Sequence, residues 1–173
     1  MSITILQGDI VTAQVDAIVN AANPIMLGGG GVDGAIHRAA GPKLLGECLK
    51  VREVDGVRCP FGEARITSAG NLTCNYVIHT AGPIYKNETN PQAVLSQSYT
   101  NCLTLALEHN CSSIAFPAIS CGVYGYPANE AADIAIGICS QQIYSRLDIY
   151  FYLHDIEMYN IWLSAYKQIS SNL

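Results

Sequence analysis

The residues of this chain whose types could do chemistry gather in two loops. The first loop and the helix expected after it contain Asn20, Asn23, Asp33 and His37 around four successive glycines, Gly28–Gly31. On a helix Asp33 and His37 share one face, where the carboxylate can hold or activate a water molecule and the histidine can orient it or move a proton. The two asparagines offer amide groups to a sugar hydroxyl. The structural alternatives are that Asp33 caps the helix and that Asn20 and Asn23 form turns.

The glycine run itself predicts an anion site. Four successive glycines lose much chain entropy on folding, so bare backbone must be needed there. Backbone N–H groups that lead into a helix N-terminus bind an anion without any basic side chain. The second loop, residues 118–127, also lies between an expected strand and an expected helix, and neither loop contains Lys or Arg. Together the two loops could hold a diphosphate. The alternative is that the glycines only make a flexible turn.

Other familiar patterns are incomplete in this sequence. Gly29, Gly31 and Gly34 match the dinucleotide pattern G-x-G-x-x-G, but Pro24 and several more residues separate them from the preceding strand. Cys121 could pair with a histidine as a nucleophile, although nothing near it in the sequence indicates an activated thiol. His79 is expected to be structural. The histidines lack metal-ligand spacing and no C-x-x-C pair occurs, so no metal and no cofactor is predicted.

The expected elements place both loops at one edge of a sheet. Short apolar runs rich in β-branched and aromatic residues predict strands at residues 3–7, 17–20, 64–68, 76–80, 113–117 and 148–153. Helical spacing of apolar residues predicts helices at 91–110, 127–145 and 155–170, the last capped by Asp155. Strands that are apolar on both faces indicate helices on both sides. We therefore predict an α/β fold, a three-layer α/β/α domain over residues 1–173, with ligands bound beyond the carboxyl ends of the strands.

The composition excludes several other classes of protein. Half of the 173 residues are hydrophobic and 13% are charged, which excludes a disordered chain. Nine Lys and Arg against fourteen Asp and Glu give a net charge of −5, so we expect no binding to nucleic acid or to anionic membranes. The N-terminus has no signal-peptide pattern, and seven scattered cysteines are typical of a reducing compartment. We expect a cytoplasmic monomer.

Taken together, the loops and their flanking strands resemble the macrodomain family, specifically the MacroD-type bacterial enzymes that process ADP-ribose. The matching segments follow in order along the chain: QGDI at 7–10, VDAIVNAAN at 15–23, GGGGVDGAIHRAAG at 28–41, VIHTAGP at 77–83 and FPAISCGVYGYP at 116–127. The resemblance implies a mixed, mostly parallel central sheet between helices. It also implies that ADP-ribose binds in a cleft at the crest of that sheet.

The resemblance assigns expected binding roles to individual residues. Asp9 would bind the adenine amino group, and the backbone of Ile10 would contact the ring. Main-chain amides of the two loops would hold the diphosphate, and the expected donors are Gly30, Gly31, Val32, Ser120, Cys121, Gly122, Val123 and Tyr124. The Tyr124 side chain would also pack against the distal ribose.

The resemblance further implies a hydrolase that uses neither a metal nor a cofactor. Asn20 and Asn23 would orient the distal ribose, and Asp33 would position or activate the attacking water with support from His37. The substrates would be O-acetyl-ADP-ribose and proteins that carry mono-ADP-ribose on acidic side chains. Attack at the ester carbonyl and attack at the anomeric carbon both remain open. The alternative is a module that binds ADP-ribose without cleaving it, and a nicotinamide-dependent oxidoreductase is a third hypothesis that rests on the glycine pattern alone.

Overall fold

A computed structural model describes residues 2–172 of the chain. Within these residues six strands form one sheet in the order β1-β6-β5-β2-β4-β3. The strands are β1 (Ser2–Gln7), β2 (Ala17–Ala21), β3 (Ala64–Ser68), β4 (Tyr76–Thr80), β5 (Ser113–Phe116) and β6 (Asp148–Leu153). Neighbouring strands are parallel except for the antiparallel pair β3 and β4. The predicted strands and the mixed, mostly parallel sheet are therefore confirmed.

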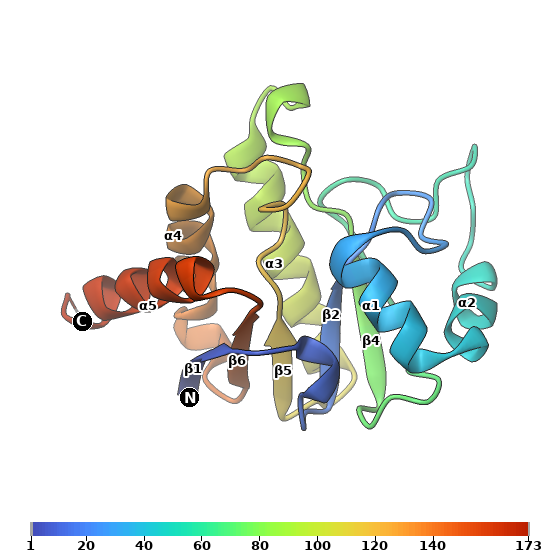
Figure 1. Cartoon of the computed structure of the whole chain (residues 1–173), viewed down its shortest axis with the longest axis horizontal. Helices are drawn as coiled ribbons and strands as arrows, with labels where there is room; N and C mark the ends of the chain where they lie inside the picture. The colour runs from blue at the N-terminus through green and yellow to red at the C-terminus, as the bar shows by residue number, and fades with distance from the viewer. Residues whose placement is uncertain (1, 173) are drawn as a thin grey trace.

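The described chain has five α-helices, and they cover both faces of the sheet. They are α1 (Gly31–Ala40), α2 (Pro42–Leu49), α3 (Pro91–Glu108), α4 (Ala128–Cys139) and α5 (Ile156–Ser170). Helices α3, α4 and α5 pack on one face, and α1 and α2 pack on the other (Figure 1). The three-layer arrangement is confirmed. None of the helices in residues 2–172 is both long enough and apolar enough to cross a membrane.

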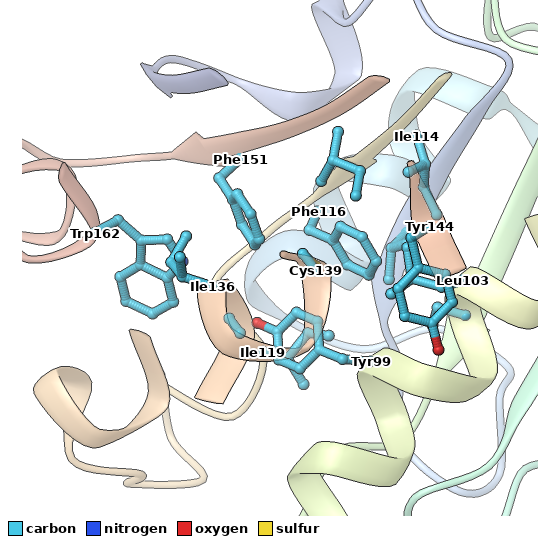
Figure 2. Packing of buried hydrophobic residues seen from close by; sticks show 14 of the residues in the cluster. Tyr99, Leu103, Ile114, Phe116, Ile119, Ile136, Cys139, Tyr144, Phe151 and Trp162 are labelled. Atoms are coloured by element: carbon cyan, nitrogen blue, oxygen red, sulfur yellow. The ribbon is translucent and has the colours of Figure 1, made fainter. Parts of the chain in front are cut away.

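Each face of the sheet has its own hydrophobic core, because successive strand residues point to opposite sides. In β2, Ile18 joins the core under α1 and α2, whereas Val19 joins the core under α3 and α4. The larger core is built on aromatic side chains (Figure 2): the ring of Phe116 on β5 lies 5.1 Å from that of Tyr99 and 5.6 Å from that of Phe151 on β6. Burying each such side chain contributes about 1.5–3 kcal/mol. This packing holds β5 in place beneath the second loop.

The end of one helix and the presence of another differ from the sequence prediction. The helix expected over residues 127–145 ends at Cys139, and a separate 3-10 turn follows over Gln142–Tyr144. The polar residues after Cys139 add no apolar contact that would continue the helix. Helix α2 was not expected from periodicity, and it begins at Pro42 directly after Gly41, whose φ of 77° ends α1. The predicted cap of α5 is confirmed, since the carboxylate of Asp155 accepts a hydrogen bond from the Met158 N–H.

Candidate active site

The two loops singled out in the sequence lie side by side in the structure. They follow β2 and β5, which are neighbouring parallel strands at the middle of the sheet. Between them is a cavity of about 360 Å³, within the size range of small-molecule sites. Its lining comes almost entirely from the two loops and the start of α1: Ala21, Ala22, Asn23, Gly29, Gly30, Gly31, Val32, Asp33, Ala118, Ser120, Gly122, Val123 and Tyr124.

The glycines of the first loop have two effects. They allow the backbone to pack closely where it leads into α1, and they leave the cavity wall without side chains. Gly28 and Gly31 have φ values of 98° and 58°, which favour glycine. A β-carbon on Gly34 would lie 2.6 Å from the Gly29 carbonyl oxygen. Gly30 is different, because its φ of −92° suits any residue and a β-carbon there would meet nothing within 4 Å. The fold does not need glycine at position 30, and its effect is to leave the cavity open.

The glycine pattern of a dinucleotide fold is not in the required place. Strand β2 ends at Ala21 and α1 begins only at Gly31, so the strand does not run directly into the glycines. Helix α1 then stops at Ala40. The oxidoreductase hypothesis therefore loses the structural context on which it depended.

The second loop is held in an unusual backbone conformation by Ser120. This residue has a φ of 66°, its hydroxyl donates to the Pro83 carbonyl at 2.8 Å, and its own carbonyl accepts from the Tyr126 N–H at 2.9 Å. Gly82 permits this approach, since a β-carbon at that position would clash with the Ser120 side chain. The left-handed conformation costs about 1–2 kcal/mol in a residue with a side chain, and the two hydrogen bonds offset that cost.

Backbone donors of the second loop are available to a ligand. The N–H groups of Gly122, Val123 and Tyr124 have no hydrogen-bond partner within residues 2–172. Because the free N–H groups at the start of α1 line the same cavity, an anion between the loops would meet main-chain donors from both sides.

Cys121 departs from the role expected of it. Its N–H donates to the Ala118 carbonyl at 3.3 Å, its thiol donates to the Ile119 carbonyl, and it does not line the cavity. Its main-chain donor is thus already used within the loop. Burial raises the pKa of the Cys121 thiol to about 12, which agrees with a packed cysteine and not with a nucleophile.

Asp33 presents one carboxylate oxygen to the cavity and keeps the other anchored. Its Oδ1 accepts a hydrogen bond of 2.8 Å from Nδ2 of Asn20. Its Oδ2 and the Nδ2 atom of Asn23 both border the space beside Gly29. A β-carbon added to Gly29 would lie 3.1 Å from this oxygen and 3.4 Å from this nitrogen. Burial raises the pKa of Asp33, and the Asn20 hydrogen bond and nearby His37 act in the opposite direction. Gly30 is the N-cap residue of α1, and the side chain of Asp33 is not a cap.

The two asparagines have separate positions. Asn20 is fully buried and lies behind Asp33, outside the cavity lining, and its side chain donates a hydrogen bond to that carboxylate. Asn23 lines the cavity and also forms the expected turn, because its Oδ1 accepts from the Met26 N–H at 2.9 Å and its Nδ2 donates to the Gly28 carbonyl at 3.2 Å. For Asn23 the turn and the binding interpretations are therefore compatible.

His37 and Tyr124 approach Asp33 from two elements. Nε2 of His37 lies 3.4 Å from Oδ1 of Asp33, yet no hydrogen bond aligns between them. Tyr124 lines the cavity from the second loop, and the ring of Phe61 meets its ring edge-on at 6.4 Å. Burial, with the charge of Asp33 as a smaller cause, raises the pKa of the Tyr124 hydroxyl.

Asp9 and Ile10, the residues expected at an adenine ring, do not line this cavity. They lie at the start of a 3-10 turn, Ile10–Thr12, that follows β1 and packs against α1. Asp9 is exposed and its Oδ1 accepts from the Val11 N–H, while Ile10 is buried. Any contact they make with a ligand would lie beyond the space between the two loops.

Two buried polar side chains connect to the site: His79, which was expected to be structural, and Thr67, which sequence reasoning did not consider. His79 on β4 lies 3.1 Å from Nδ2 of Asn20, and Thr67 on β3 lies 3.0 Å from the other ring nitrogen of His79. No local pattern could have found this connection, because only the pairing register of β2, β4 and β3 places Thr67 and His79 on the same face as Asn20.

The fold and this cavity define a class: a three-layer domain with two glycine-containing loops at the crest of a mixed sheet. The family model described as Macro domain matches residues 19–135, and the chain belongs to this family. Macro domain-containing protein VPA0103 of Vibrio parahaemolyticus is 60% identical over 167 residues, which cover 96% of this chain and 98% of that protein. The O-acetyl-ADP-ribose deacetylase of Escherichia coli K12 is 51% identical over 159 residues, 90% of this chain and 89% of that enzyme.

Solved structures agree with this assignment. The Oceanobacillus iheyensis macrodomain with ADP superimposes with a TM-score of 0.91 at 42% identity, covering 96% of this chain and 90% of that one. The Trypanosoma brucei macrodomain in complex with ADP-ribose gives a TM-score of 0.82 at 40% identity, covering 94% of this chain and 68% of that one.

Proposed function

We propose that this macrodomain binds ADP-ribose between its two loops and hydrolyses O-acetyl-ADP-ribose and mono-ADP-ribose esters on acidic side chains of proteins. The observation that carries the proposal is the carboxylate of Asp33, with one oxygen anchored by Asn20 and the other facing a cavity bordered by free backbone donors. The similarity to enzymes named O-acetyl-ADP-ribose deacetylase supports the acetyl ester as a substrate.

Binding of a diphosphate suits a cavity whose donors are backbone amides. The protein has a net charge of −5, yet the free N–H groups of Gly122, Val123 and Tyr124 and those at the start of α1 create a local positive potential. The distal ribose would then lie near Asn23 and Asp33, with Tyr124 beside it. Asp9 and Ile10 would contact the adenine at the other end of the ligand.

Asp33 is suited to act as a general base. A carboxylate whose pKa is raised by burial accepts a proton from water more readily near neutral pH. A water held by Oδ2 beside Asn23 would attack the ester, its proton passing to Asp33 as the new O–C bond forms. In attack at the carbonyl the acyl–oxygen bond breaks, and the ribose oxygen that leaves takes the proton back from Asp33, so the acid and the free sugar hydroxyl are released. In attack at the anomeric carbon, which requires the ester oxygen to be bonded to that carbon, the bond from this carbon to oxygen breaks and the acid leaves as its carboxylate. Oxygen-labelled water distinguishes these routes, because the label enters the acid in the first and the ribose in the second.

The test measures release of acetate and ADP-ribose from O-acetyl-ADP-ribose. Asp33→Ala should lose most turnover and keep its affinity for ADP-ribose in calorimetry. Asp133→Ala, which removes an exposed carboxylate of α4 outside the cavity lining, is the matched control and should keep the rate. An unchanged rate in Asp33→Ala would remove this residue from the mechanism. Affinity for ADP-ribose without cleavage of either type of ester would instead identify a binding module.

A further inference from the structure

A line of polar side chains crosses the sheet face that is otherwise packed by apolar residues under α1 and α2. It consists of Asn20 on β2, His79 on β4 and Thr67 on β3, with exposed fractions of 0%, 1% and 7%. Asn20 and His79 are register partners on neighbouring strands, and Thr67 lies diagonally across from His79. At one end of the line Asn20 meets Asp33, so the line connects the cavity to the interior of the fold.

At each contact along this line, one side chain must donate the hydrogen bond and the next must accept it, starting from Asp33. A carboxylate only accepts, so Nδ2 of Asn20 donates one hydrogen to Asp33 at 2.8 Å. The same nitrogen lies 3.1 Å from Nδ1 of His79 and can donate its second hydrogen there only if Nδ1 carries none. Burial lowers the pKa of His79 to about 3, so the ring is neutral and its hydrogen lies on Nε2. That hydrogen points to Oγ1 of Thr67 at 3.0 Å, and Sγ of Cys48, at 3.8 Å from the same nitrogen, is a weaker and more distant partner.

The other tautomer of His79, with its hydrogen on Nδ1, would require the side-chain amide of Asn20 to be flipped. If His79 carried its hydrogen on Nδ1, the Asn20 oxygen would have to face both the histidine and Asp33, where it would repel the carboxylate. In the observed arrangement Oδ1 of Asn20 has no hydrogen-bond partner within the described chain, a cost of about 1–3 kcal/mol. Apolar side chains would pack this face without that cost, so packing alone does not account for the line.

We propose that His79 and Thr67 are positioning residues for the reaction at Asp33: the Thr67 hydroxyl accepts the Nε2 hydrogen of His79 and so favours that tautomer, whose free Nδ1 holds the Asn20 amide with its N–H toward Asp33. The Oδ2 atom of Asp33 then stays turned toward the cavity and Asn23. The predicted effect on turnover rests on the proposed function, whereas the predicted state of His79 rests only on the burial and hydrogen-bond geometry of its ring.

The acidic limb of the pH–rate profile should report the integrity of the line. The other titratable groups facing Asp33 are His37 on α1, Cys48 on α2 and Tyr124 on the second loop. The hydrogen bond from Asn20 lowers the pKa of Asp33, so weakening it leaves the carboxylate protonated up to a higher pH. Because the base must be ionised to accept a proton, activity should then fall at a higher pH than in the wild type.

The kinetic test compares Thr67→Val, which removes the hydroxyl at nearly constant volume, with Thr67→Ser, which keeps it. Thr67→Val should lower kcat for O-acetyl-ADP-ribose by about three- to tenfold, with KM and the Kd for ADP-ribose changed by less than about twofold. Thr67→Ser should recover most of the rate and the wild-type acidic limb. Ser98→Ala removes another fully buried hydroxyl, from α3 on the opposite face of the sheet, and should change neither. An unchanged kcat in Thr67→Val, or an equal loss in Ser98→Ala, would overturn the proposal.

A second measurement does not depend on turnover. In the wild-type protein with ¹⁵N-labelled histidine, NMR should show His79 with its hydrogen on Nε2 and no titration between about pH 5 and pH 9. In Thr67→Val both tautomers should be populated. A wild-type hydrogen on Nδ1 would refute the proposed selection even if the enzyme is active. If the tautomer is as expected and no ester is cleaved, the proposed function fails while the hydrogen-bond line stands.

Discussion

Replacing Gly29 with alanine would add one methyl group between the two polar side chains that face the cavity. The new β-carbon would lie 3.1 Å from Oδ2 of Asp33, which must move by a few tenths of an ångström, and 3.4 Å from Nδ2 of Asn23, which is ordinary van der Waals contact. The methyl group would also occupy the space where a water held by both residues would lie. Since a displacement of 1 Å in a reacting group costs about 100-fold in rate, we expect kcat to fall by about tenfold or more.

The stability of the same variant should change in the opposite direction. Gly29 does not have a positive φ, so alanine fits its backbone conformation. Such a replacement stabilises the folded protein by about 0.4–1 kcal/mol through the unfolded chain, or about 1–4 °C in the melting temperature. Gly46→Ala is the matched control, because a β-carbon at this exposed position of α2 would meet nothing within 4 Å. It should raise the melting temperature to a similar degree with no loss of rate.

Acetate release and thermal denaturation are measured for the wild type, Gly29→Ala and Gly46→Ala, to separate an effect on the reaction from an effect on the fold. A Gly29→Ala variant as active as the wild type would show that no reacting water lies between Asp33 and Asn23. A large fall in its melting temperature would show instead that the crowding damages the fold, and the loss of rate could not then be assigned to the reaction.

Two further predictions concern stability. Because burial holds the folded pKa of Asp33 above its unfolded value near 3.8, this carboxyl stabilises the fold below that pH, and the contribution is lost as the pH rises through the folded pKa. Asp33→Asn should therefore melt at a higher temperature than the wild type at pH 7, by a margin that shrinks on acidification, and an equal margin at pH 7 and pH 4 would contradict this account. Ser120→Ala keeps the strained φ of 66° and loses the bond to Pro83, so it should lower the free energy of unfolding by about 1–2 kcal/mol in urea denaturation. Ser120→Gly should lose less, since glycine adopts this conformation freely, and the reverse order would refute the explanation.

Most of the fold could be predicted because its signals are local. Strands such as β5 and β6 consist of short runs of β-branched and aromatic residues, and the apolar spacing in α3 and α5 repeats every three to four residues. Those patterns depend only on how side chains alternate along a strand or around a helix. Helix α2 was harder to predict, because an eight-residue helix has too few turns for its periodicity to stand out. The end of α4 was also not predicted correctly.

The candidate site was predictable in part for the same reason. The Gly28–Gly31 run and its position between a strand and a helix can be read from neighbouring residues, and so can Asp33 four residues before His37. The separate roles of Asn20 and Asn23 could not, although only two residues lie between them. Asn20 is the fourth residue of β2 and points into the core, whereas Asn23 lies in the turn that follows.

Residue types and their spacing are enough to identify the helices, the strands and the chemistry carried by the two loops. The contacts between side chains depend instead on how the strands pair. The antiparallel pairing of β3 with β4 brings Thr67 to His79, and the parallel pairing of β4 with β2 brings His79 to Asn20. Strand register and strand order arise from packing between segments far apart in the chain, and a local pattern of residue types carries no information about such distant partners.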